Sequence, residues 1–288
     1  MAAIVHTRCN SLPSASHPFV SQFEEHLQRL KGSEATTPFS SSSACCKLDG
    51  LQDLHECTCR LLQLPTEQRA LAQECDNKCS DDILEGSLRL LDICSTAKDC
   101  LMQSKESLNE LQSIIRRRRG GDTGFAVAAA KYSSSRKIMK KTIRKALENL
   151  KATKNEVMAS SSNKDNNTFS MLSFLKEAEE VTQSSLESLL LLISDRKRRT
   201  KHSTWSMISK LVQPKRVECD SPESDTSEFE MVDAALQSLT IHKPSSIEYF
   251  QSQMENLEMC IQDLELRVEQ LSRKLIRSRV SLLNIFSQ

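Results

Sequence analysis

A heptad pattern of apolar residues near the C-terminus constrains the fold more than any other feature of this 288-residue sequence. Between residues 247 and 285, apolar side chains recur at alternating spacings of three and four, and only Ser278 breaks the register. A pattern kept over roughly five heptads is typical of a coiled-coil seam, and about 40 helical residues form a rod about 60 Å long. The sequence leaves open whether the seam packs on another helix of the same chain or on a second chain. The seam consists of Ile247, Phe250, Met254, Leu257, Ile261, Leu264, Val268, Leu271, Leu275, Leu282 and Ile285.

The composition favours helices over the rest of the chain. Only six glycines and seven prolines are present, and aromatic residues make up 4%. Sandwiches and barrels need many turns and favour aromatic side chains, so we predict an all-α fold built as a bundle of long antiparallel helices. We expect a disordered arm over residues 1–16, the bundle core over 17–194, a charged connector over 195–244 and the coiled-coil-like helix over 245–288.

Local signals place several helix ends within the core. Pro65 is expected to end one helix and Thr66 to cap the next. Residues 125–158 are expected to form a basic helix with a thin apolar stripe of Ile138, Ile143, Leu147 and Leu150.

Charge is strongly segmented although the net charge is only +1. Residues 114–154 hold thirteen Lys/Arg and two Asp/Glu, and residues 194–216 hold eight Lys/Arg and one Asp. Such runs usually form solvated faces, but they also resemble nuclear-import signals, and an anionic membrane surface is equally compatible with them. Nucleic-acid binding is less favoured because the nearby aromatic residues follow no pattern. The two clustered runs are Arg116, Arg117, Arg118 and Arg119, and Arg196, Lys197, Arg198 and Arg199.

Residues that could carry chemistry are scattered. The closest approach to a metal site is His55, Cys57 and Cys59, followed by Cys75 and Cys79, but the first three lie in one expected helix at a spacing that points them to different sides. We therefore expect no metal, no cofactor and no enzymatic activity, with an enzyme or binder of a small signalling metabolite as the alternative. The longest apolar run, residues 189–193, is far too short to span a membrane.

Several segments together resemble a plant-specific family, the BYPASS-related proteins. The resemblance rests on "HTRCNSLPSASHP" at 6–18, "GSLRLLDICSTAKDCLMQSKESLNELQSIIRRRRGG" at 86–121, "FLKEAEEVTQSSLESLLLLIS" at 174–194 and "CIQDLELRVEQLSRKLIRSRVSLLNIFSQ" at 260–288. It departs from the usual opening at Cys9 and Ala15. The resemblance implies a helical plant protein associated with root and shoot development, and it supplies no catalytic residues.

The N-terminal arm carries a candidate phosphorylation and docking site. Arg8, Ser11 and Pro13 form the pattern R-x-x-S-x-P, in which arginine suits a basophilic kinase and phosphoserine could dock in the arginine cluster of a phosphoserine-binding protein. Ser227, ahead of two glutamates, is a second candidate. The sequence thus predicts a non-enzymatic helical adaptor, intracellular in cytoplasm or nucleus with the plastid as an alternative. Its partners would be proteins bound through helices, and the alternative is a nuclear or nucleic-acid-associated regulator.

Overall fold

The computed structural model describes residues 17–34, 40–117, 121–160, 170–195, 227–241 and 247–287, and within these ranges every element of regular structure is a helix. The all-α prediction is therefore confirmed; the arm of residues 1–16 lies outside the described residues. The helices are α1 (Pro18–Glu34), α2 (Ser41–Leu61), α3 (Pro65–Glu74), α4 (Asn77–Arg116), α5 (Gly121–Ser160), α6 (Met171–Ile193), α7 (Glu228–Ile241) and α8 (Ile247–Phe286).

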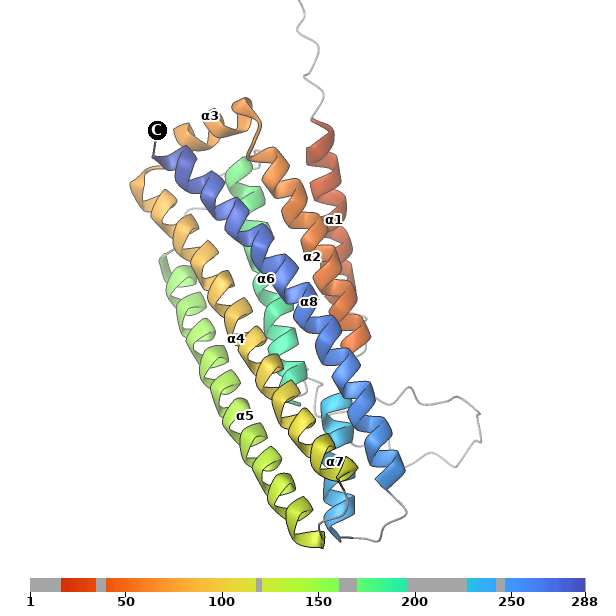
Figure 1. The fold of residues 1–288 in the computed structure, drawn as a ribbon. Coiled ribbons are helices and arrows are strands. Elements are labelled where there is room, and N and C mark those ends of the chain that lie inside the picture. The colour runs from red at the N-terminus through yellow and green to blue at the C-terminus, as the bar shows by residue number, and fades with distance from the viewer. Residues whose placement is uncertain are drawn as a thin grey trace, which may run out of the picture.

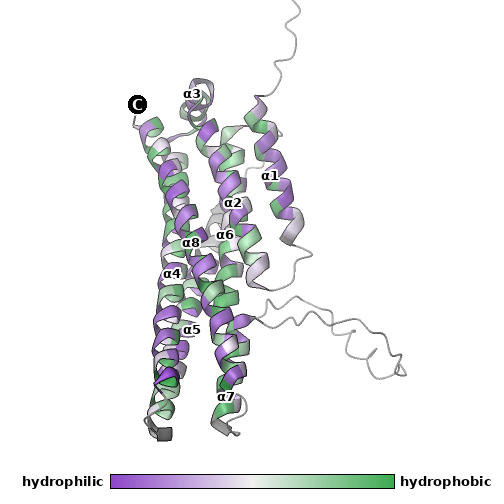
Figure 2. Cartoon of the chain, turned by 45° about the vertical axis from the view of Figure 1, so that its right-hand side comes forward, coloured by the Kyte–Doolittle hydropathy of each residue, from purple (hydrophilic) through white to green (hydrophobic). Residues whose placement is uncertain are grey.

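The long helices run side by side as an up-and-down bundle (Figure 1). Helices α2, α4, α5 and α6 alternate in direction, and α8 lies along both α2 and α4. Helix α1 packs on α2, and α5 packs on α4. Along each long helix hydrophilic and hydrophobic residues alternate (Figure 2), as expected for helices with one face toward a core. None of the described helices is both long and apolar enough to cross a membrane.

The heptad seam lies inside this bundle. Its side chains from Phe250 to Ile285 are buried against the other helices, and Ile247 packs at the edge of the same core. The break at Ser278 has a partner, because its hydroxyl lies 3.1 Å from the Cys59 thiol of α2. Of the two arrangements that the sequence left open, the structure shows the intramolecular one.

Ion pairs along the flanks of α8 connect it to α4 and to α2. Lys98 of α4 contacts Glu269 at 2.5 Å, and Lys274 contacts Glu56 of α2 at 2.7 Å. These side chains are partly exposed, so the pairs contribute little free energy, and the buried seam supplies most of the stability.

The boundaries around α3 differ from the sequence prediction. Helix α2 ends at Leu61, and Pro65 begins α3 rather than ending the preceding helix, since proline fits the first helical turn. Thr66 is inside α3 and does not cap it. The cap of α4 is Asp76, whose carboxylate accepts a hydrogen bond from the Cys79 amide at 2.7 Å.

Two further features were not predicted. The region expected as a charged connector contains α7, whose Phe229 and Val232 are fully buried in the common core. In α5, Ile138 was expected on the apolar stripe but is 59% exposed, while its neighbour Met139 is buried. The inward stripe of α5 instead consists of Ala128, Ala129, Tyr132, Arg136, Met139, Ile143, Leu147 and Leu150.

Candidate functional site

An arginine sits on the buried face of α5. Arg136 lies in helical phase with Tyr132 and Ile143, and only 3% of it is exposed. A charged side chain taken out of water at this depth must be paired, because its desolvation otherwise costs several kcal/mol.

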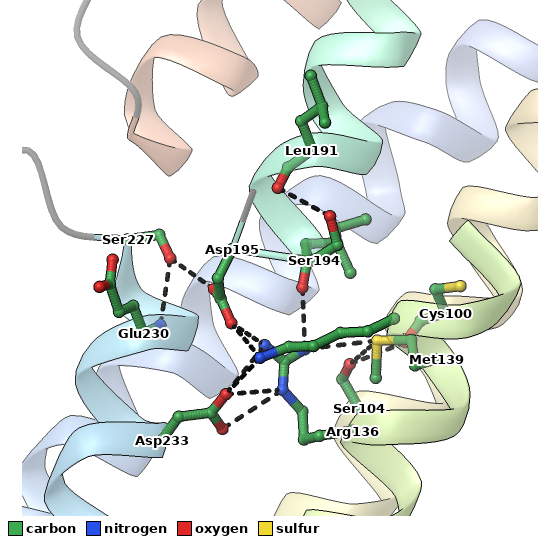
Figure 3. Close-up of polar contacts among 12 residues, drawn as sticks. Cys100, Ser104, Arg136, Met139, Leu191, Ser194, Asp195, Ser227, Glu230 and Asp233 are labelled. Carbon is green, nitrogen blue, oxygen red and sulfur yellow. Dashed lines mark hydrogen bonds and ion pairs between the residues drawn. The ribbon is translucent and has the colours of Figure 1, made fainter. Parts of the chain in front are cut away.

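Groups from the end of α6 and from α7 surround the guanidinium (Figure 3). Its Nη2 lies 2.5 Å from Asp195 Oδ2, and its Nε lies 3.3 Å from Asp233 Oδ2. Its Nη1 donates to the Ile193 carbonyl at 2.9 Å, and the Phe229 ring of α7 stacks near it, 5.1 Å from centroid to Cζ. One side chain of α5 thus holds both the end of α6 and the start of α7.

Two more side chains of α5 complete the cluster. Lys140 Nζ lies 2.9 Å from Asp195 and 3.1 Å from Asp233, and the Tyr132 hydroxyl donates to Asp233 at 3.1 Å. Two cations therefore face two carboxylates, so the cluster is neutral as a whole. We call Arg136, Lys140, Tyr132, Asp195 and Asp233 the arginine clamp.

The surroundings of Arg136 and Tyr132 determine which of these two side chains is charged. Burial alone would lower the pKa of Arg136, but Asp233 and Asp195 reverse this and raise it above its ordinary value. Burial, with Asp233 as the next cause, raises the pKa of Tyr132. The guanidinium consequently stays protonated and the phenol stays neutral, so each acts as a donor.

The clamp also fixes the backbone on both sides of residues 196–226. Asp195 has a φ of 54°, a left-handed conformation that aspartate tolerates better than most residues, and its carboxylate is tied to α5. The Ser227 hydroxyl donates to Asp195 Oδ1 at 2.8 Å and accepts from the Glu230 amide at 3.1 Å, which caps α7. Asp195 and Ser227, the described residues on either side of this range, are therefore held together at the clamp.

This arrangement is suited to holding helices together. The donors of Arg136 are aimed at carboxylates, a carbonyl and the Met139 sulfur of the same chain. The charged groups of the site thus pair with one another across α5, the end of α6 and α7. The arrangement is that of a structural site that holds these helices together.

Of the serine and arginine candidates from the sequence, the structure describes Ser227, Arg116 and Arg117. Ser227 is only 1% exposed, so a kinase reaches its hydroxyl only after the bond to Asp195 opens, and its phosphorylation stays a prediction. Arg116 and Arg117 are exposed at the end of α4. The remaining candidates, Arg8, Ser11, Pro13, Arg118, Arg119, Arg196, Lys197, Arg198 and Arg199, lie outside the described residues.

The histidine and cysteines of α2 turn to different neighbours. His55 Nε2 lies 2.8 Å from Thr182 Oγ1 of α6, whereas Cys59 faces Ser278 of α8. Cys75 and Cys79 come within 3.0 Å of each other between α3 and α4. Across the described ranges, no three His, Cys, Asp or Glu side chains gather in a group that could hold a metal ion.

The clamp residues were missed by the sequence reasoning, although a signal for one of them existed. Arg136 stands seven residues before Ile143 and three before Met139, in the register of the buried stripe. Choosing Ile138 as a stripe residue hid that register. Asp195 and Asp233 carry no local signal, because each lies within a segment crowded with other charges.

A second candidate site lies on the outside of α8. Its outward face, opposite the seam, carries large apolar side chains that are 43–59% exposed. Met259, Leu266 and Val280 are separated from one another by 7 or 14 residues and form one row along the helix. Ile276 and Leu283, which are 7 residues apart, form a second row beside it. We call these five residues the outer stripe of α8. Several large apolar side chains exposed on one helix face are a candidate interaction site.

Comparison with known proteins identifies the family of the chain. The family model described as Protein BPS1 matches residues 47–285, a range that contains the arginine clamp, the heptad seam and the outer stripe. No curated protein and no solved structure matches the chain. Because the match extends over most of the 288 residues, the chain belongs to the BPS1 family.

Proposed function

We propose that this protein is a non-enzymatic helical regulator of plant development that acts by binding other proteins. The developmental role rests on the family resemblance, which implies root and shoot development. The mode of action rests on the outer stripe of α8. The heptad seam is occupied by the protein's own helices, so a partner has to use a surface that the bundle leaves uncovered.

The outer stripe supports protein binding by its geometry. Its members recur at helical spacing on one face of a 40-residue helix, and Leu266 and Met259 are 56% and 59% exposed. A partner with an apolar groove or an amphipathic helix would cover such a face, as in helix-in-groove recognition. The same contact would remove exposed apolar area from water, which drives association.

The interior supports a role without catalysis. Several buried polar side chains make contacts between helices, as in the bond between His55 and Thr182 and in the ion pairs of Arg136. Polar groups used in this way stabilise one arrangement of helices.

The proposal is tested by affinity purification of the full-length protein from plant tissue. A variant with Leu266→Asp and Val280→Asp is expected to lose the partners that the wild type recovers. The matched control carries Leu88→Asp and Met102→Asp on α4, where the side chains are 40% and 42% exposed. Recovery of the same partners by both variants would reject the outer stripe as the binding surface.

We further propose that the N-terminal arm is a phosphorylation-dependent handle. Ser11, with Arg8 three residues before it and Pro13 two after it, is the residue expected to carry the phosphate. Phosphoserine-binding proteins are expected among the partners of the wild type and absent from those of Ser11→Ala. Identical partners for both would remove the arm from the proposal without affecting the outer stripe.

A further inference from the structure

The outward face of α5 is strongly basic. The helix turns its buried stripe toward α4, α6 and α7, and Figure 1 shows α5 at the edge of the bundle. Its opposite face is exposed along several turns. The basic residues on that face and its flank are Lys131, Lys137, Lys141, Arg144, Lys145 and Lys151.

Little negative charge compensates this face. Lys131 is paired with Glu110 at 2.7 Å, and Arg144 lies 4.0 Å from Glu148 in the next turn. No carboxylate among the described residues lies within ion-pair distance of Lys137 or Lys141, and the same holds for Lys145.

Two lysines of α4 are, by contrast, paired with carboxylates of the same molecule. Lys98 and Lys105 of α4 face Glu269 and Glu265 of α8, at 2.5 and 3.2 Å. The charges of these two lysines are thus neutralised within the molecule. Within the described ranges, the charges of Lys137, Lys141 and Lys145 on the outer face of α5 are not.

Exposed aliphatic side chains stand among these lysines. Val127 is 71% exposed and Ile138 is 59% exposed. Residues 127, 131, 134, 138, 141 and 145 follow alternating spacings of four and three, so both aliphatic residues lie on the same outward crest as Lys141 and Lys145. A crest of lysines with interspersed aliphatic groups combines electrostatic attraction with shallow insertion.

We propose that the outer face of α5 binds the surface of an anionic lipid bilayer. Clustered lysines act as point charges that suit a layer of anionic headgroups, while the described part of this face has no aromatic side chain on which nucleic-acid bases would stack. Because α5 lies at the edge of the bundle, residues from several turns of this face can reach one flat surface. The aliphatic side chains of Val127 and Ile138 enter the headgroup region.

The experiment measures flotation of the full-length protein with vesicles. Binding is expected to phosphatidylcholine vesicles that contain phosphatidylserine, to be absent with phosphatidylcholine alone, and to weaken as salt is added. The variant with Lys137→Glu, Lys141→Glu and Lys145→Glu is expected to partition roughly 100-fold more weakly or worse. Circular dichroism checks that it folds, as expected for substitutions at exposed positions.

A matched control carries the same three charge reversals at exposed positions on other helices, namely Arg69, Lys78 and Lys176. It is expected to bind anionic vesicles nearly as the wild type does. A second variant, Ile138→Ser, keeps all the charges and is expected to lose the part of the binding that survives high salt.

Two results would overturn the proposal. One is the absence of binding to anionic vesicles, including the case in which the α5 face captures an acidic protein or a nucleic acid instead. The other is equal loss of binding in the charge-reversed α5 variant and its control, which would assign the effect to total charge. The outer-stripe variant of α8 separates this proposal from the proposed function, because it is expected to leave vesicle binding unchanged.

Discussion

Arg136 shows what a single buried charge does in this molecule. The side chain is almost fully covered, and its positive charge is matched by Asp195 and Asp233, which come from outside its own helix. An ion pair buried in this way is weak evidence for net stability, yet removing one member is costly because the others stay behind uncompensated.

Arg136→Leu is therefore expected to lower the free energy of unfolding by about 3–5 kcal/mol. The remaining Lys140 cannot neutralise both carboxylates, and α7 loses its main attachment to α5. Urea unfolding measures the change. Arg144→Leu, at an exposed pair on the same helix, is the control and is expected to cost less than about 1 kcal/mol. Equal effects of the two substitutions would contradict the structural role of the clamp.

His55 should make stability depend on pH. The Thr182 hydroxyl donates to the Ala178 carbonyl, so His55 Nε2 carries the proton that bridges to Thr182, and Nδ1 has no hydrogen-bond partner among the described residues. Burial, with a contribution from Lys274, lowers the pKa of His55 from 6.5 to about 4. The folded protein thus keeps this imidazole neutral where the unfolded chain protonates it.

The sign of the pH effect follows from proton binding. Between pH 6.5 and about 4 the unfolded state binds a proton that the folded state does not, so stability is complete above pH 6.5 and falls as the pH drops through this window. Thermal melts of the wild type and His55→Gln should differ in pH slope there, by roughly 3 kcal/mol over the window. Equal slopes for the wild type and His55→Gln in this window would contradict the prediction.

At the scale of the element, α8 carries buried leucines on one face and exposed leucines on the other. Leu271 belongs to the buried seam, whereas Leu266, five residues earlier, is 56% exposed. Leu271→Asp, like Leu264→Pro, is expected to unfold α8 and with it the bundle, because a charge or a helix break is forced into the core. Leu266→Asp is expected to change the melting temperature little. Circular dichroism melts of equal midpoint for both aspartate variants would contradict the assignment of the two faces.

The elements differed in how far the sequence predicted them. Helix α8 was predictable because its apolar period is sustained and its buried set contains Ser278 as the one polar exception. In α5 one buried arginine and one exposed isoleucine reverse the usual relation between hydropathy and burial, so the stripe was assigned one residue out of phase at Ile138. Helix α7 was missed because its acidic first turn continues an acidic run.

The clamp itself could not have been predicted from local patterns. Its members are separated by up to 101 residues, the distance in sequence between Tyr132 and Asp233. Helical periodicity states which face of a helix is buried, but it does not state which other helix covers that face. The pairing of Arg136 with two particular aspartates is decided by the packing of three helices together.

At the scale of the whole molecule, the clamp allows a test with a divided chain. A protease site inserted within residues 196–226 would separate α1–α6 from α7 and α8, while leaving intact the contacts of α8 with α2 and α4 and those of the clamp. The two fragments are expected to elute together in size-exclusion chromatography and to separate in denaturant. With Arg136→Leu they should separate at lower denaturant; separation without denaturant in the wild type would show that the connection itself holds the fold.

The position of α8, which packs on α2, α4 and α7, also has a consequence for how the protein is made. Its 40 residues are synthesised after those of α2 and α4 and, at ordinary rates of synthesis, take about 2–8 s to produce. Until then the apolar surface that α8 covers on α2 and α4 stays exposed, so we expect chaperones to bind the nascent chain. A stop codon introduced ahead of α8 would therefore remove a helix that packs on both α2 and α4.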